Sequence, residues 1–284
     1  MKKFITALFV VIFCCFFNTT KVIAQEVKCP ANLNMLSESE KAKLDVAGDG
    51  RKIHAIDTGN ATGLLCAYKN EKLEREERYK NGQKEGVSRL YNENGKLEME
   101  VPYKNGKAEG VGKVYYENGK LRAEFPHEND KTEGIGREYY ETGKLKAEFP
   151  WKNDKVEGIV KEYYESGKLK EEIPYKNGQR EGMGKRYHEN GKLSSEMPFK
   201  NDEGEGIGKV YDKNGRLIYE VPMKNSKRNG IAKLYRENGK NKLTITYSDN
   251  VPVSGVCHRS YGTKESLTNA ELTNLQNGFD PACD

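Results

Sequence analysis

Residues 134–157 read GIGREYYETGKLKAEFPWKNDKVE, and this pattern recurs along most of the chain. Its first glycine returns every 24 residues, and it is followed by a tyrosine five positions later, a second glycine after nine, a leucine after eleven and a proline after sixteen. The first glycines are Gly86, Gly110, Gly134, Gly158, Gly182, Gly206 and Gly230. Such a period is typical of repeat proteins, in which each unit packs against its neighbours.

Each unit predicts a β-hairpin, and two turns fit its sequence. A two-residue type I′ turn at Asn94-Gly95 would put Tyr91 and Leu97 on opposite faces of the hairpin. A three-residue loop that adds Glu93, with Gly95 left-handed as a bulge, would pair Tyr91 with Leu97. We prefer the second register because it makes every cross-strand pair on one face apolar.

This register predicts one apolar, aromatic-rich face and one solvated face. The expected apolar pairs are Val87 with Val101, Val111 with Phe125, Ile135 with Phe149, Ile159 with Ile173, Met183 with Met197 and Ile207 with Val221. The solvated face would carry Lys96, Glu98, Glu100 and a proline, Pro102, at the strand end. The predicted fold is therefore all-β, an elongated antiparallel meander or solenoid of tandem 24-residue hairpins with short helical segments at the ends.

The repeat pattern decays towards both ends, which divides the chain into four expected parts. These are a signal peptide (1–24), an N-terminal cap and linker (25–61), an array of about eight units (62–254) and a C-terminal cap (255–284). Ser37 to Glu40 and Thr268 to Glu271 have the spacing of helix capping boxes. We expect a short helix near residues 268–277 to cover the open end of the sheet.

The N-terminal residues have the layout of an export signal. Lys2 and Lys3 precede an apolar run over residues 4–17, and Val22-Ile23-Ala24 then offers a signal peptidase site. This run is shorter than a membrane-spanning helix requires. Removal of residues 1–24 takes away three lysines and no acid, which lowers the formal charge from +5 to +2. A chain so close to neutral does not indicate a nucleic-acid partner, nor does its charge indicate a membrane surface.

Four cysteines remain after cleavage, namely Cys29, Cys66, Cys257 and Cys283. They allow three disulfide connectivities, and export would place them in an oxidising compartment. We favour Cys29–Cys66 and Cys257–Cys283, because this pairing closes two short loops, one near each end of the array. Free thiols or metal ligands are the alternative, although no CxxC or Cys/His spacing supports a metal site.

The unit Glu-Gly-x-x-x-x-Tyr-x-x-x-Gly-Lys-Leu, ending in Tyr-Lys-Asn-Gly, resembles the variant MORN repeat of bacterial proteins. The resemblance covers about residues 63–247. It departs from the family pattern in carrying a proline before the last aromatic residue of most units. The resemblance implies a β-hairpin array used for contacts with proteins or membrane surfaces, and some members of the family are labelled antitoxins.

The sequence carries no signature of an enzyme or of a cofactor site. The acids Glu85, Glu109, Glu133, Glu157 and Glu181 recur in the same place of each unit, which favours a structural role, because catalysis needs one asymmetric constellation. The position after the proline varies instead, as Tyr103, His127, Trp151, Tyr175, Phe199 and Met223. This column either packs between units or lines a partner site, and Trp151 is its strongest binding candidate.

We therefore predict a non-catalytic, exported scaffold, periplasmic or extracellular, that contacts a protein or another envelope component. Two alternatives stay open. Periodic aromatic residues could stack on sugars in a glycan or cell-wall binding protein. An antitoxin-like inhibitor is the other alternative, and it requires that the toxin be exported too.

Cleavage at the expected site gives a mature chain that begins at Gln25. N-terminal sequencing of the protein recovered from the natural host checks this expectation. A full-length cytoplasmic product would rule out the export signal.

Overall fold

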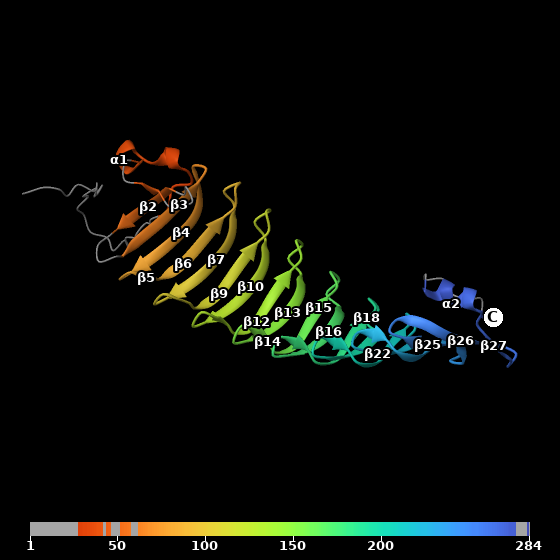
Figure 1. Cartoon of the computed structure of the whole chain (residues 1–284). Helices are drawn as coiled ribbons and strands as arrows, with labels where there is room; N and C mark the ends of the chain where they lie inside the picture. The colour runs from red at the N-terminus through yellow and green to blue at the C-terminus, as the bar shows by residue number, and fades with distance from the viewer. Residues whose placement is uncertain (1–27, 42–43, 47–51, 58–61, 277–282, 284) are drawn as a thin grey trace, which may run out of the picture.

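In the computed structural model, which describes residues 28–41, 44–46, 52–57, 62–276 and 283, the strands form one antiparallel sheet. Figure 1 shows these strands side by side along an elongated, twisted ribbon, with the first and last described segments at opposite ends. The expected all-β meander of tandem hairpins is confirmed. The predicted signal peptide lies outside the described residues.

Each unit consists of a six-residue opening strand, an eight-residue returning strand and a two-residue connecting strand. The opening strands are β6 (Gly86–Tyr91), β9 (Gly110–Tyr115), β12 (Gly134–Tyr139), β15 (Gly158–Tyr163), β18 (Gly182–Tyr187), β21 (Gly206–Tyr211) and β24 (Gly230–Tyr235). The returning strands are β7 (Leu97–Lys104), β10 (Leu121–Glu128), β13 (Leu145–Lys152), β16 (Leu169–Lys176), β19 (Leu193–Lys200), β22 (Leu217–Lys224) and β25 (Asn241–Ser248). The connecting strands are β5 (Gln83–Lys84), β8 (Lys107–Ala108), β11 (Lys131–Thr132), β14 (Lys155–Val156), β17 (Gln179–Arg180), β20 (Glu203–Gly204) and β23 (Lys227–Arg228).

The first loop of each hairpin has the predicted three-residue form. Tyr91 pairs with Leu97, and the amide of Asn92 donates to the carbonyl of Lys96 at 2.9 Å. Gly95 has a φ of +75°, the left-handed conformation that glycine adopts without a steric penalty. The preferred turn register is therefore confirmed.

The second loop is a two-residue turn in which both central residues have positive φ. Asn105 and Gly106 have φ values of +51° and +82°, as a type I′ turn requires. Where the glycine is replaced by Asp130, the residue keeps a φ of +68° and its carboxylate accepts from the amide of Ala108 at 2.6 Å. The replacement thus adds a hydrogen bond to the preceding unit, and Asp154, Asp202, Ser226 and Asn250 do the same.

A β-bulge two residues after the first loop changes the pairing expected for the rest of the hairpin. The register shifts by one residue between Leu90 and Tyr91, so Val87 lies opposite Pro102, not Val101. The corresponding predictions for Val111, Ile135, Ile159, Met183 and Ile207 are wrong for the same reason, since each of these residues faces a proline. The prolines also lie inside the returning strands and not at their ends.

A glycine and a proline meet at every junction between units from β7 onward. Gly158 has a φ of +118°, and a Cβ placed on it would lie 3.2 Å from Cγ of Pro150 in the preceding unit. The carbonyl of Pro150 accepts from the amide of Glu157 at 2.9 Å. The chain can therefore bend between β14 and β15 and bring its backbone against the proline ring only where a side chain is absent.

The N-terminal cap begins with a 3₁₀ turn, η1 (Leu33–Met35), and the short helix α1 (Glu38–Lys41). The strands β1 (Asp45–Val46), β2 (Lys52–Asp57), β3 (Gly63–Lys69) and β4 (Lys72–Lys80) follow. Strand β2 pairs along its whole length with β3, so this stretch is part of the sheet and not the linker that we expected. The Cys29–Cys66 disulfide is confirmed, and it joins the cap to a core that includes Leu33, Leu36 and Tyr68.

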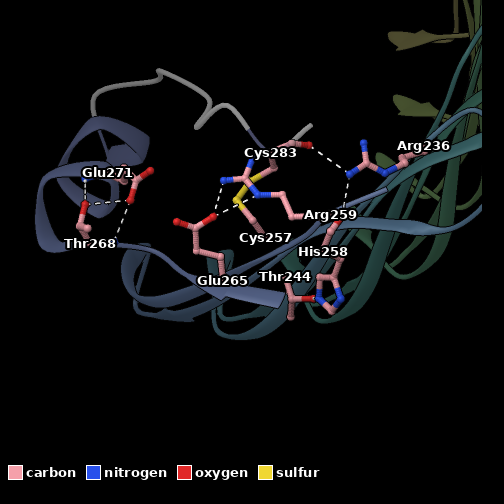
Figure 2. The surroundings of a disulfide bond; sticks show 9 residues. All are labelled: Arg236, Thr244, Cys257, His258, Arg259, Glu265, Thr268, Glu271 and Cys283. Atoms are coloured by element: carbon pink, nitrogen blue, oxygen red, sulfur yellow. Dashed lines mark hydrogen bonds and ion pairs between the residues drawn. A yellow bond between two sulfur atoms is a disulfide. The ribbon is translucent and has the colours of Figure 1, made fainter. Parts of the chain in front are cut away.

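The C-terminal cap consists of β26 (Val251–His258), β27 (Lys264–Ser266) and the helix α2 (Asn269–Gln276). Thr268 and Glu271 form the predicted capping box, with the amide of Thr268 donating to the Glu271 carboxylate at 2.8 Å. Figure 2 shows the confirmed Cys257–Cys283 disulfide, and Arg236 donates to the carbonyl of Cys283 at 3.2 Å. Leu267 and Leu275 pack on the buried cluster around Cys257, so the helix closes this end as expected.

Two glycine-to-alanine variants test the junction. Gly158→Ala should destabilise the protein more than Gly167→Ala, because a Cβ at Gly167 meets nothing within 4 Å although φ there is +85°. We expect a cost of about 1–2 kcal/mol from positive φ at Gly167 and about 1–3 kcal/mol more at Gly158 from the clash with Pro150. Urea unfolding of both variants measures the difference, and equal costs would contradict the proposed contact.

Candidate functional site

The six residues proposed as a binding column lie on one face of the sheet, which we call the ring face. Each occupies the next-to-last position of a returning strand, opposite the first glycine of its own hairpin. Tyr103, His127, Trp151, Tyr175, Phe199 and Met223 are all half-buried. The structure therefore brings the predicted residues together in one line that runs along the array.

Several of these rings pack against a glycine on the neighbouring strand. A Cβ on Gly136 would lie 3.0 Å from Nε1 of Trp151, and one on Gly184 would lie 2.8 Å from the ring of Phe199. Among the described residues, the buried Nε1 of Trp151 has no hydrogen-bond acceptor. These packing contacts join the two strands of one hairpin, whereas the structural interpretation expected packing between units. The role of the column as a partner site stays a prediction.

The middle of the ring face carries charges beside this column. Glu162 and Glu171 lie directly opposite each other on β15 and β16, an arrangement of like charges that is unfavourable without a cation. Arg186 donates to Glu171 at 2.5 Å, and Lys170 lies 3.3 Å from Glu162. The positions equivalent to Glu162 are apolar in the first and last units, at Leu90 and Leu234, although Leu90 pairs with Arg75, which lies 3.7 Å from Glu77 on the same face. The chemistry of the ring face therefore differs from unit to unit.

The opposite face carries an exposed apolar row, which sequence reasoning missed. It alternates one aliphatic or methionine side chain with one proline, and we call it the ridge. Its exposed members are Val111, Ile135, Ile159, Met183, Ile207 and Ile231, with exposed fractions between 41% and 56%. All of these except Ile231 are residues that we expected to find inside apolar cross-strand pairs. The bulge in the returning strand gives them prolines as neighbours in place of the expected apolar partners, and no sequence signal beyond the recurring proline could have located it.

Beside the ridge runs a row of alternating charges, one on each strand, that the sequence analysis also missed. The charge row consists of Glu76, Arg89, Glu100, Lys113, Glu124, Arg137, Glu148, Lys161, Glu172, Lys185, Glu196, Lys209, Glu220 and Lys233. Neighbours approach as ion pairs, at 3.4 Å for Arg137 with Glu148 and 3.2 Å for Lys209 with Glu196. Opposite charges on facing strands stabilise a sheet modestly.

The charge row also receives the tyrosine of each unit. The hydroxyl of Tyr115 donates to Glu100 in the preceding unit at 2.7 Å, and Tyr163 donates to Glu148 at 3.0 Å. Burial, reinforced by this hydrogen bond, raises the pKa of Tyr115 to about 12. The tyrosines and glutamates therefore share a face, which corrects the expectation that Glu148 lies on a separate, solvated face.

The recurring acids before each first glycine bind the next turn. Glu85 accepts from the amide of Asn105 at 2.8 Å, and Glu133 accepts from the amide of Asn153 at 2.8 Å. At the other edge of the sheet, Nζ of Lys96 donates to the carbonyl of Glu117 at 2.7 Å. These side chains hold consecutive units together, and the interpretation of the repeated acids as structural agrees with these contacts.

The described residues offer little that resembles a catalytic or metal centre. Within them, no three histidine, cysteine or carboxylate side chains gather as a metal site requires. Hollows lie between the first loops of neighbouring units, and one of about 180 Å³ is lined by Lys72, Leu73 and Tyr91. No helix in this part of the chain is long and apolar enough to cross a membrane.

Comparison with known families gives six tandem matches to the MORN repeat variant. They cover residues 84–105, 108–129, 132–153, 156–177, 180–201 and 204–225, so the matched region spans half of the chain. Each match begins at a connecting strand and ends in the following second loop.

No curated protein matches the chain in sequence. Among solved structures, virginiamycin B lyase from Staphylococcus aureus aligns with 78% of this chain and 90% of its own, at 11% sequence identity and a TM-score of 0.18. A likeness this weak carries no argument about fold or function.

The tyrosine–glutamate bonds predict a loss of stability at high pH. The pKa of Tyr115 in the folded protein lies above its ordinary value of 10.0, so its stabilising contribution is complete below pH 10 and is lost as the pH rises towards 12. Tyr115→Phe should destabilise by about 1 kcal/mol at pH 8 and by less at pH 11. Urea unfolding at both pH values measures this, with the exposed Tyr261→Phe as the control. A cost that does not change with pH would contradict the assignment.

Proposed function

Because the chain belongs to the MORN repeat variant family, we propose that it is a non-catalytic, exported scaffold that binds a protein partner along its ring face. A repeat array suits this task, because each unit contacts only its neighbours and the resulting surface is long and continuous. The partner would lie across the central units, where Trp151, Tyr175 and Phe199 follow one another.

One observation carries this proposal, namely that the half-buried column changes from unit to unit while most residues that join the units repeat. The acids and lysines at the loops are used in bonds between units, and the charge row alternates without variation. Discrimination between partners needs positions that differ, and the column supplies them. Beside it, Glu162, Glu171 and Arg186 add polar groups in the central units.

The combination of rings and carboxylates on one face also favours a second candidate, binding of a glycan. Aromatic rings can stack on the apolar side of a sugar while Glu162 and Glu171 accept bonds from its hydroxyl groups. Inhibition of an exported toxin would be one case of protein binding, not a separate use of the surface.

Export is part of the same proposal. Two disulfides, one at each end of the array, fit an oxidising compartment such as the periplasm or the cell exterior. They tie down the terminal units, where a repeat stack is most prone to fray. The N-terminal sequence layout supports the same destination.

Trp151→Ala should weaken capture of the partner by about 2 kcal/mol or more, because a buried aromatic anchor of an interface typically contributes this much. The measurement is capture from a cell-envelope extract by wild-type and variant mature protein, followed by affinity measurement on the identified partner. Ile207→Ser, on the opposite face, is the matched control and should leave capture unchanged.

Because Trp151 is the single tryptophan of the chain, its fluorescence reports binding at this site directly. Purified peptidoglycan fragments or chitin oligosaccharides that shift its emission would favour the glycan candidate. Undiminished capture by a folded Trp151→Ala variant, together with unchanged emission in the presence of the captured partner, would place the site elsewhere.

A further inference from the structure

We propose that the ridge and the charge row form an interface between two copies of this chain, packed face to face and antiparallel. This interface lies on the sheet face opposite the ring face, so it is independent of the partner site proposed above. Two copies joined in this way would leave both ring faces open on the outside of the dimer.

The ridge has the character of a surface that is covered in use. Its exposed aliphatic and methionine side chains form one line from Val111 to Ile231, and the prolines fill the positions between them. Contiguous apolar surface of this kind on a soluble protein marks an interaction site. It is bordered on one side by charges, as the apolar core of an interface is bordered by a polar rim.

The spacing of the ridge restricts what can cover it. One aliphatic side chain recurs every second strand, which is roughly 10 Å at ordinary strand spacing. A partner that contacts several units at once must therefore present apolar groups at the same interval. A second copy of the chain meets this condition without further assumptions, because its own ridge has the same period.

An antiparallel arrangement also makes the charges complementary. Consider a two-fold axis that lies in the interface between β15 and β16, the central hairpin, and runs along the strands. It places β15 of one copy over β16 of the other, so that Ile159 covers Pro174 and Lys161 faces Glu172, since these residues are already at the same level along their strands. One strand further out, Pro150 faces Met183.

A parallel arrangement lacks this match. If the two copies ran in the same direction, the ridges would still meet, but each charge row would lie on the far side of the ridge from the other. The charge row alternates between acid and base from one strand to the next. The antiparallel arrangement therefore places every acid of one copy opposite a base of the other copy. Because sheets twist, we expect the contact to be closest in the central units and to open towards the ends.

Disulfide trapping tests this arrangement. The double variant Pro150→Cys, Met183→Cys should give a covalent dimer on mild oxidation, because the dimer brings each new cysteine against the other one of the second copy. Within one chain the two positions are three strand spacings apart, roughly 14 Å, which is too far for an internal disulfide. Pro126→Cys, Met183→Cys is the matched control, since β10 and β18 do not face each other in the dimer.

Sedimentation of the mature wild-type chain over a range of concentrations provides the second measurement. We expect a dimer that Ile159→Lys weakens at least tenfold, whereas Trp151→Ala leaves dimerisation unchanged because it lies on the ring face. A monomeric wild type, a dimer indifferent to Ile159→Lys, or equal cross-linking of the two cysteine pairs would each overturn the proposal. None of these results depends on the partner of the ring face, so failure here would leave the proposed function standing.

Discussion

The contact between a glycine and the proline of the preceding unit is the constraint on which the rest of the array depends. At Gly158 the backbone has a φ of +118°, which L side chains rarely adopt, and a Cβ there would crowd the ring of Pro150 at 3.2 Å. This bend separates the two-residue connecting strand from the opening strand that follows it. As a result the returning strand β13 pairs with β14 at one end and with β15 nearer its middle. The same glycine–proline contact recurs from Gly110 to Gly230, so each unit can add its strands to the same sheet.

The junction explains why so many polar residues recur without forming a catalytic site. Only two residue pairs, Ala147 with Glu162 and Glu148 with Lys161, join β13 to β15 as a ladder. The units must therefore be held together at their edges as well. Glutamates that accept from turn amides, lysines that donate to loop carbonyls and tyrosines that donate to the charge row provide these bonds. The unit is thus a structural module held to its neighbours by these recurring bonds.

The two faces of the sheet divide the remaining roles. On the ring face, glycines and alanines let large side chains lie close to the backbone, as Trp151 does over Gly136. On the ridge face, every strand presents the same few residue types. A variable face suits recognition of a dissimilar partner, whereas a repetitive face suits contact with an equally repetitive surface. This division is the physical basis for assigning the partner site to one face and self-association to the other.

The sequence by itself determined the repeat and the hairpin, and it favoured the three-residue first loop, the capping boxes and the disulfide pairing that the structure has. These features depend on local chemistry, such as the left-handed glycine at Gly95, or on the short loops that the cysteines close. The binding column could be located as a variable position, but its packing over glycines could not be foreseen, because those contacts join different strands.

Only the tertiary structure decided which residues share a face. One bulge after the first loop shifts the pairing by a single residue. Since side chains alternate along a strand, this shift places Pro174 instead of Ile173 opposite Ile159, and it brings Glu148 to the same face as Tyr163. Periodicity alone is identical for both registers. The choice between them lies in the bulge of the returning strand, which the repeating pattern of residue types does not mark.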